Sequence, residues 1–409
     1  MIRYLYVITI FVFSIVTSCT FFGIEKEEPE VNGFIPLWEY DFNIGYFSSL
    51  DPIIHDNKVI YTSLDEKRND LMANNTLEAF NKENGEMIWR WDETVDKPGD
   101  QFYFKGRHHI YNNILYISSG ADYAINLDNG TTDHYLNETK YGGQAFFGKE
   151  NKIYTALSNI DSELQLERSD IVVSGTESFD WKLFLKGLTT DSTVIGFNQV
   201  IFDKLEPNLL FIPYTEAYWG VEKVFTGLMV FNLLKYEVIL DKKITEIGDK
   251  YPVEQLSIIH DDRIFIPTRG KTICLDKNTG ELLWQTEVNG RASLSGILFP
   301  ENNQLYVNTE FGVYCLDPET GAFKWKKEFG EKEGNSSRMQ YHNDVIYYIG
   351  GGRFHARDAN TGEQLLFFEA PSSAKDDGAF FQPVMTFDHE NDRIYTASYT
   401  HAYCYPTLR

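Results

Sequence analysis

The sequence predicts an all-β fold: a β-propeller of about eight four-stranded blades in which the N-terminal strand closes the last blade. The first observation is a repeat. An Asp-x-x-Thr-Gly turn followed by Trp occurs at residues 276–284 and recurs 41 residues later, at 317–325. A period of about 40–45 residues is typical of four-stranded propeller blades. The second observation is that each end of the chain carries only part of a repeat, and joining the two parts would leave no long free strand edge.

The turn and the Trp have separate structural roles in the repeat. An Asp side chain at the start of the turn can accept hydrogen bonds from backbone N–H groups further on, and a Gly at its end can adopt the positive φ that such turns need. The Trp then lies on a fixed strand face and can pack against the neighbouring unit. Six residues therefore define the structural repeat motif: Asp276, Gly280, Trp284, Asp317, Gly321 and Trp325.

Weaker copies of the unit occur along the rest of the chain, at 79–91, 126–136, 174–185, 231–240 and 356–368. We expect the Trp residues in register with the motif to be core residues, and this set includes Trp38, Trp89 and Trp181. The repeat is most divergent between about residues 140 and 250. The C-terminal copy lacks its Trp strand, and the stretch "FIPLWEYDF" at 34–42 supplies it. Residues 34–409 are therefore predicted to form a single propeller domain.

The first 33 residues have the pattern of an exported, lipid-modified protein. Residues 1–18 combine Arg3 with an apolar stretch too short for a comfortable membrane span, which is typical of a signal peptide. Val16-Thr17-Ser18-Cys19 resembles a bacterial lipobox, in which the signal is removed and the Cys is acylated. An ordinary secretory signal followed by a chance Cys is the alternative. Residues 19–33 are polar and acidic, and we interpret them as a flexible tether.

Composition excludes one class of partner. The 409-residue chain has a formal net charge of -23, which argues against nucleic acid because phosphates need Lys and Arg partners.

Cys274, Cys315 and Cys404 occupy the same position in different repeats, so we expect them to be buried as small hydrophobic residues and not to form a disulfide.

The turn and Trp at this period resemble the repeat of the PQQ-repeat, or quinoprotein alcohol dehydrogenase-like, propellers. A lipobox before a propeller of this length is similar in organisation to the outer-membrane protein assembly lipoproteins of the β-barrel assembly machinery. The resemblance covers residues 34–409 and is weakest in the divergent middle and at 63–76. The dehydrogenases of this superfamily use a quinone with calcium, and their site has an adjacent Cys pair that this sequence lacks. We therefore expect no cofactor.

Catalytic and metal-ligating residues are not evident. His55, His260, His342 and His389 stand in equivalent turns of different repeats, so we expect them on one rim of the ring and far apart. A metal site needs ligands that converge on one point. No nucleophile–base arrangement or phosphate-binding Gly loop is present. We predict no enzymatic activity.

An aromatic segment interrupts one of the divergent units. Tyr214, Tyr218 and Trp219 lie in "IPYTEAYWGVEKVFTG" at 212–227, and Trp219 is out of register with the repeat Trp residues. Aromatic side chains on a loop of a rigid scaffold could contact a protein or a sugar. The alternative is that the loop folds back on its own blade. These three residues form the candidate binding loop.

The leading functional hypothesis is a non-enzymatic propeller scaffold that is anchored in the outer membrane by acyl chains on Cys19 and binds protein partners, with β-barrel assembly components as candidates. The alternative is a surface lipoprotein that binds a glycan or a peptide. A quinoprotein-type oxidoreductase is the third hypothesis. All three place the chain in the cell envelope, and the sequence leaves open whether it faces the periplasm or the cell surface.

Overall fold

A computed structural model describes residues 34–42, 50–64, 75–93, 107–118, 121–136, 146–160, 167–186, 193–197, 199–218, 224–246, 257–268, 270–290, 292–330, 337–371 and 380–409. The predicted signal peptide, Cys19, the predicted tether and Trp219 lie outside these residues. Ile35–Arg409 form one compact unit. The described residues contain no helix long and apolar enough to cross a membrane.

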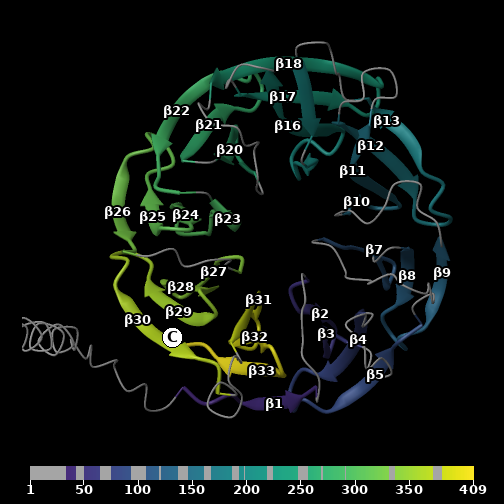
Figure 1. Ribbon diagram of the computed structural model, residues 1–409, viewed down its shortest axis with the longest axis vertical. Helices are drawn as coiled ribbons and strands as arrows, with labels where there is room; N and C mark the ends of the chain where they lie inside the picture. The colour runs from purple at the N-terminus through teal and green to yellow at the C-terminus, as the bar shows by residue number, and fades with distance from the viewer. Residues whose placement is uncertain are drawn as a thin grey trace, which may run out of the picture. The chain divides into compact units, whose positions relative to one another are not determined.

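Eight antiparallel sheets are arranged around a common axis in this unit (Figure 1). Blade 1 consists of β2 (Ile53–His55), β3 (Lys58–Leu64), β4 (Asn75–Asn81) and β5 (Met87–Trp91). Blade 2 consists of β6 (His109–Tyr111), β7 (Ile114–Ser118), β8 (Asp122–Asn126) and β9 (Thr132–Leu136). Blade 3 consists of β10 (Phe147–Lys149), β11 (Lys152–Ile160), β12 (Glu167–Gly175) and β13 (Lys182–Leu185). Blade 4 consists of β14 (Thr193–Phe197), β15 (Ile201–Phe202), β16 (Leu209–Tyr218), β17 (Val224–Asn232) and β18 (Glu237–Glu246).

The second half of the chain is more regular. Blade 5 consists of β19 (Ile258–His260), β20 (Arg263–Thr268), β21 (Lys271–Asp276) and β22 (Leu282–Glu287). Blade 6 consists of β23 (Ala292–Leu298), β24 (Leu305–Thr309), β25 (Gly312–Leu316) and β26 (Phe323–Glu328). Blade 7 consists of β27 (Gln340–His342), β28 (Val345–Gly350), β29 (Arg353–Asp358) and β30 (Gln364–Glu369). Blade 8 consists of β31 (Phe381–Asp388), β32 (Arg393–Ser398), β33 (His401–Pro406) and, from the other end of the chain, β1 (Trp38–Asp41).

The burial pattern follows the position of each strand in its blade. The second and third strands are covered on both faces by neighbouring blades, so they are continuous apolar runs, as in β28 with "VIYYIG" fully buried. The fourth strands lie on the outside of the ring and alternate, as in β26 with "FKWKKE". A half-buried strand needs this period of two because successive side chains point to opposite faces.

Neighbouring blades are joined by a contact between the Trp of one blade and the Gly turn of the next. A Cβ added to Gly321 would lie 2.5 Å from a ring carbon of Trp284, and the φ of Gly321 is +71°. Only Gly fits both the left-handed turn and the indole above it. The Trp284 indole also donates a hydrogen bond to the carbonyl oxygen of Pro318, at 2.9 Å. The same Gly contact and indole bond occur at three more junctions: Trp38–Gly85, Trp89–Gly130 and Trp325–Gly362.

The Asp turn positions that Gly. The Asp317 carboxylate accepts hydrogen bonds from the backbone N–H groups of Glu319 and Thr320, at 3.0 and 2.9 Å, and from the Thr320 hydroxyl at 3.0 Å. The N–H of Gly321 donates to the carbonyl oxygen of Asp317, at 2.8 Å. Asp276 and its turn make the same bonds. The motif is therefore an interblade joint as well as a turn.

The N-terminal strand closes the ring, as predicted. β1 pairs with β33 in antiparallel register, from Trp38 opposite Cys404 to Asp41 opposite His401. The fold class and the closure are both confirmed. Cys274, Cys315 and Cys404 are free and buried in the third strands of their blades.

Trp181 does not occupy the position that the repeat predicted for it. It precedes β13, and its indole donates to the Asp122 carboxylate of blade 2 at 2.8 Å, towards the preceding blade and not the next. Phe184 occupies the position of the repeat Trp instead, on the outer strand facing the next blade. It packs against Phe231 of blade 4, with ring centroids 4.6 Å apart. The turn before Trp181 is irregular, which shifts the register by three residues. The expectation for Trp181 was wrong in this respect.

Candidate functional site

A cavity of about 710 Å³ lies among the inner strands of the ring. It is lined mainly by residues at the beginning of those strands, in blades 1, 2, 3, 4, 5, 7 and 8. In each blade the start of the inner strand lies beside the end of the second strand, because the two are antiparallel. The cavity is therefore on the side of the ring where the second and third strands are joined by their hairpin turns.

Four polar residues of the cavity stand at one equivalent position, two residues before an inner strand. They are Asp51 before β2, Arg107 before β6, Gln199 before β15 and Arg338 before β27. A propeller brings equivalent positions of its blades around the central axis. This placement explains how side chains from distant parts of the sequence line one cavity.

Charged groups dominate one side of the cavity. The Asp51 carboxylate forms an ion pair with the Arg338 guanidinium, at 3.2 Å, and accepts a hydrogen bond from the backbone N–H of Met385 at 3.1 Å. The Arg107 guanidinium lies over the Phe147 ring, 5.0 Å from its centroid. Among the described residues, no carboxylate lies within 4 Å of Arg107. Two guanidinium groups thus face one carboxylate.

Burial and neighbouring charge determine the ionisation of these groups. Burial, reinforced by Arg338, lowers the pKa of His108 to about 4, so this imidazole is neutral at pH 7. Burial and the nearby Arg338 lower the pKa of Arg107 to about 9, which leaves it largely protonated at pH 7. Burial raises the pKa of Asp51, and the ion pair with Arg338 opposes that change. The charged lining is therefore net cationic in a protein of formal net charge -23.

Two buried polar side chains of the lining have free hydrogen-bonding atoms. The Gln199 side-chain oxygen accepts a hydrogen bond from the backbone N–H of Ser257 at 3.2 Å, which orients the amide. The Gln199 Nε2 and the Ser257 Oγ have no hydrogen-bond partner, although the two residues are only 2% and 6% exposed. Buried polar groups are rarely left without a partner, but neither of these two atoms is accessible from the cavity, so we do not assign them to a ligand.

Long hairpins flank the cavity side of the ring. β11 and β12 have nine residues each, and β16 and β17 have ten and nine, whereas the second and third strands of the other blades have five to seven. In blade 3 the extra length lies beyond the inner strand: β11 continues to Ile160, although β10 pairs with it only as far as Tyr154. In blade 4 the additional strand β14 pairs with the end of β16, from Tyr214 to Tyr218. The hairpins of blades 3 and 4 therefore reach further than those of the other blades.

The candidate binding loop belongs to the second of these hairpins. Tyr214 and Tyr218 lie in strand β16, so the expectation of a loop was wrong for both. Tyr214 is buried against Gly227, and its hydroxyl donates to the Asp241 carboxylate at 2.9 Å. Tyr218, at the end of β16, is partly exposed, and its hydroxyl accepts a hydrogen bond from Lys243. Trp219 follows directly, outside the described residues.

The turn histidines are not all far apart. His342 of blade 7 and His389 of blade 8 lie in adjacent blades, with their Nδ1 atoms 3.4 Å apart. The expectation of wide separation was wrong for this pair, because equivalent turns of neighbouring blades lie next to each other. The Nε2 atom of His342 lies 2.9 Å from the Asp392 carboxylate, so the other ring nitrogen also has a partner.

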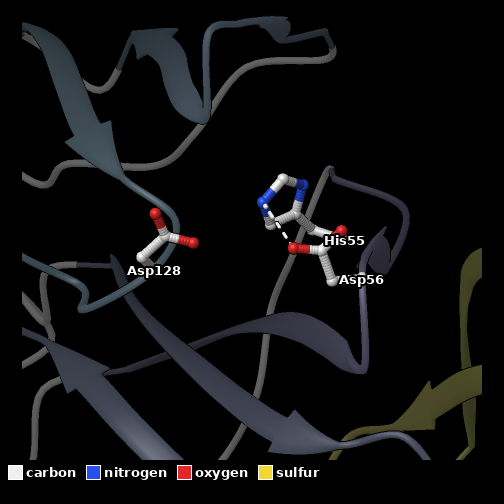
Figure 2. A group of neighbouring side chains, drawn as sticks. All are labelled: His55, Asp56 and Asp128. Carbon is white, nitrogen blue, oxygen red and sulfur yellow. Dashed lines mark ion pairs between the residues drawn. The ribbon is translucent and has the colours of Figure 1, made fainter.

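One histidine lies near two carboxylates that could contribute to a metal site. The side chains of His55, Asp56 and Asp128 each place a potential ligand atom within 4.8 Å of the others, and Figure 2 shows the three residues at the junction of blades 1 and 2. The His55 Nε2 lies 3.7 Å from the Asp56 carboxylate. Lys58 lies 3.9 Å from Asp128 and neutralises part of the negative charge. Both carboxylates are exposed, so interblade ion pairing accounts for this group and we assign no metal to it.

The cavity does not fit a quinone held together with calcium. Its described lining contains no Trp and no Cys, and its only carboxylate, Asp51, is already paired with Arg338. Calcium takes six to eight oxygen ligands, usually with several carboxylates among them. The three described cysteines lie in the third strands of different blades, away from the cavity lining.

The fold and the cavity together define a β-propeller of eight blades with a cationic central cavity. Residues 252–399 match the family model described as outer membrane protein assembly factor BamB. This stretch contains the regular repeats and covers less than half of the chain. No curated protein matches the sequence significantly.

Three solved structures show the same fold. The crystal structure of BamB from Moraxella catarrhalis matches with a TM-score of 0.59 at 10% identity. The aligned region covers 92% of this chain and 98% of the BamB chain. Quinohemoprotein alcohol dehydrogenase from Comamonas testosteroni has a TM-score of 0.61 at 12% identity, covering 92% and 77%. The computationally designed Ika8 protein has a TM-score of 0.56 at 11% identity, covering 89% and 100%. The resemblance predicted from the repeats is confirmed over residues 252–399 by the family model, and the solved structures confirm the propeller fold.

Sequence reasoning missed the cavity residues. The signal was present as a polar residue two positions before an inner strand in four units. The specific part of the repeat, the Asp turn and the Trp, lies at the outer strands, and no comparable pattern marks where each inner strand begins.

Proposed function

We propose that this protein is a non-catalytic scaffold of the bacterial cell envelope that is anchored in the outer membrane through acylated Cys19 and binds protein partners. The resemblance of residues 252–399 to BamB supports a role in protein contacts, and the lipobox-like Val16–Cys19 supports the anchor. The observation that carries the proposal is the pair of long hairpins in blades 3 and 4. Components of β-barrel assembly are the partners that the family resemblance favours.

The hairpins are suited to partner binding because they combine a rigid base with an aromatic end. Pairing between β16 and β17 runs without interruption from Leu209 opposite Asn232 to Ala217 opposite Val224. Near the end, Tyr218 packs edge-on against Phe225, with ring centroids 5.6 Å apart, and Lys243 lies over both rings. Aromatic side chains on a preorganised surface bind at low entropic cost.

The test is capture of partners by the lipidated protein from detergent-solubilised outer membranes. Changing Tyr218 and Trp219 together to Ala should reduce capture and change the free energy of unfolding by only about 1 kcal/mol, as for surface positions. Tyr135→Ala is a matched control, because Tyr135 is an exposed aromatic residue, 53% accessible, on the outer strand of blade 2. Equal capture by both variants would remove the hairpin from the proposal.

The membrane anchor is tested separately. Cys19→Ala should leave the protein in the soluble fraction or unprocessed, because acylation of this residue provides the membrane affinity. Retention of the variant in carbonate-washed membranes would contradict the lipobox interpretation. Capture of a glycan or a free peptide instead of an envelope protein would favour the alternative ligand classes, and quinone-dependent oxidation of an alcohol or sugar by purified protein would contradict the non-catalytic role.

A further inference from the structure

The central cavity has the features of a ligand site that the scaffold role does not need. It has a volume of about 710 Å³, within the range of 300–1,000 Å³ typical of small-molecule sites. Its walls include apolar side chains from several blades, such as Ile53, Phe147, Val200 and Phe202. A cavity that only filled the axis of a ring would not need charged residues at its edge.

The charged residues indicate the sign of the ligand. Holding two guanidinium groups in a partly buried cavity costs desolvation free energy, and one carboxylate can compensate only one of them. Asp51 is committed to Arg338, at 3.2 Å. Arg107 lies over the Phe147 ring and has no carboxylate within 4 Å among the described residues. One positive charge is therefore left for a ligand.

The number of uncompensated charges indicates the type of anion. Arg107 offers one positive charge and several N–H donors in a planar fork. A carboxylate carries one negative charge, and its two oxygens can accept two of these hydrogen bonds. A phosphate monoester carries nearly two negative charges and would leave one of them uncompensated in this cavity.

We propose that the central cavity binds a small organic monocarboxylate, with Arg107 pairing with the carboxylate and the apolar wall holding the carbon skeleton. This site is separate from the hairpin surface of the scaffold proposal. Capture experiments at Tyr218 and binding experiments at Arg107 therefore succeed or fail independently.

The experiment is isothermal titration of the purified propeller with three probes of the same chain length: octanoate, octanamide and octylamine. Phenylacetate provides an aromatic carboxylate, and octyl phosphate provides a dianion. We expect saturable binding of at least one of the two carboxylates, weaker binding of octyl phosphate, and no binding of the amine. This comparison uses the unaltered protein and does not depend on the folding of any variant.

Variants then locate the site. Arg107→Gln should raise the Kd of the bound carboxylate by about 10- to 100-fold, the effect expected from the loss of a charge-assisted hydrogen bond. Arg107→Lys should recover part of that loss. Arg353→Gln is the matched control, because Arg353 pairs with Glu369 at the outer strand of blade 7, where both side chains are exposed. Absence of binding by both carboxylates, equal binding of the amine, or equal effects of the Arg107 and Arg353 variants would overturn the proposal.

Discussion

The junction between blades 5 and 6 and the junction between blades 4 and 5 are built from different chemistry. At the first, Trp284 covers Gly321 and donates to the backbone of the same turn. At the second, Leu240 and Lys242 lie over Gly280, and a Cβ there would be 3.3 Å from both.

The second junction contains an ion-pair network that replaces the indole. Lys277, 3% exposed at its side chain, lies 2.5 Å from the Asp203 carboxylate and 3.2 Å from that of Glu206. Lys277 belongs to the Asp turn of blade 5, and both acids follow β15 of blade 4. The comparison shows that the ring requires a filled joint between blades but does not require the same residues in every joint.

The largest loss of stability is expected when a whole interblade joint is removed. Deletion of residues 34–42 removes β1, and with it both the Trp38–Gly85 contact and the pairing with β33. We expect a larger fall in melting temperature than for any single substitution below, because the edge of blade 8 is left unpaired and its core is open to water. Calorimetry measures this directly. An unchanged melting temperature would contradict the closure argument.

Substitution at the two joints measures their relative strength. Trp284→Ala should lower the free energy of unfolding by about 3 to 5 kcal/mol, the cost of truncating a large buried side chain. Leu240→Ala should cost about 1 to 2 kcal/mol, because Leu240 is smaller and only partly buried. Denaturant titration of both variants gives the difference. Equal costs would mean that the indole adds nothing specific to the regular joint.

Removal of one partner of the ion-pair network should lower the free energy of unfolding strongly. Lys277→Met leaves Asp203 buried without its cation, and we expect a loss of about 3 kcal/mol. The double variant with Asp203→Asn should recover part of this loss, since the uncompensated charge is gone. If the double variant is as unstable as the single one, packing of the Lys side chain and not its charge stabilises the joint.

The smallest effect concerns the dependence of stability on pH. Partial burial opposes ionisation of Asp317, but hydrogen bonds from Thr320 and Glu319 outweigh it and hold its pKa below the usual range. A carboxyl group with a lowered folded-state pKa stabilises the protein above its unfolded pKa of about 3.9, and this contribution is lost as pH falls through the folded value. Asp317→Asn should therefore be less stable than the unaltered protein at pH 7 and should approach it below about pH 4. Melting curves from pH 7 to pH 3 test this, and a constant difference would contradict it.

Most of the fold could be predicted because the repeat encodes the joint between blades. Asp317, Gly321 and Trp284 belong to short motifs that can be recognised in the sequence. In the structure these motifs form a contact between two neighbouring blades. The divergent blades could not be read in this way. The Trp181 indole turned towards the preceding blade, and Lys277 occupies a variable position of the turn, where nothing distinguishes a buried ion pair from a solvated surface charge.

The cavity was harder to predict for a geometric reason. Asp51, Arg107 and Arg338 become neighbours only because the ring closes, and they are separated by 56 and 231 residues along the chain. Each lies in a connection between blades, where sequence patterns are weakest. Their equivalence appears only once the start of each inner strand is known.

The pairing of β1 with β33 also constrains the order of events during synthesis. Trp38 leaves the ribosome among the first residues of the domain, whereas its partner Cys404 lies 366 positions later, close to the C-terminus. The first strand therefore cannot pair with β33 until almost all of the domain has been made, and so long a loop closes slowly. An incomplete chain with an unpaired strand edge is prone to aggregation. Pairing of β1 with β33, rather than formation of any other blade, is then the step that closes the ring.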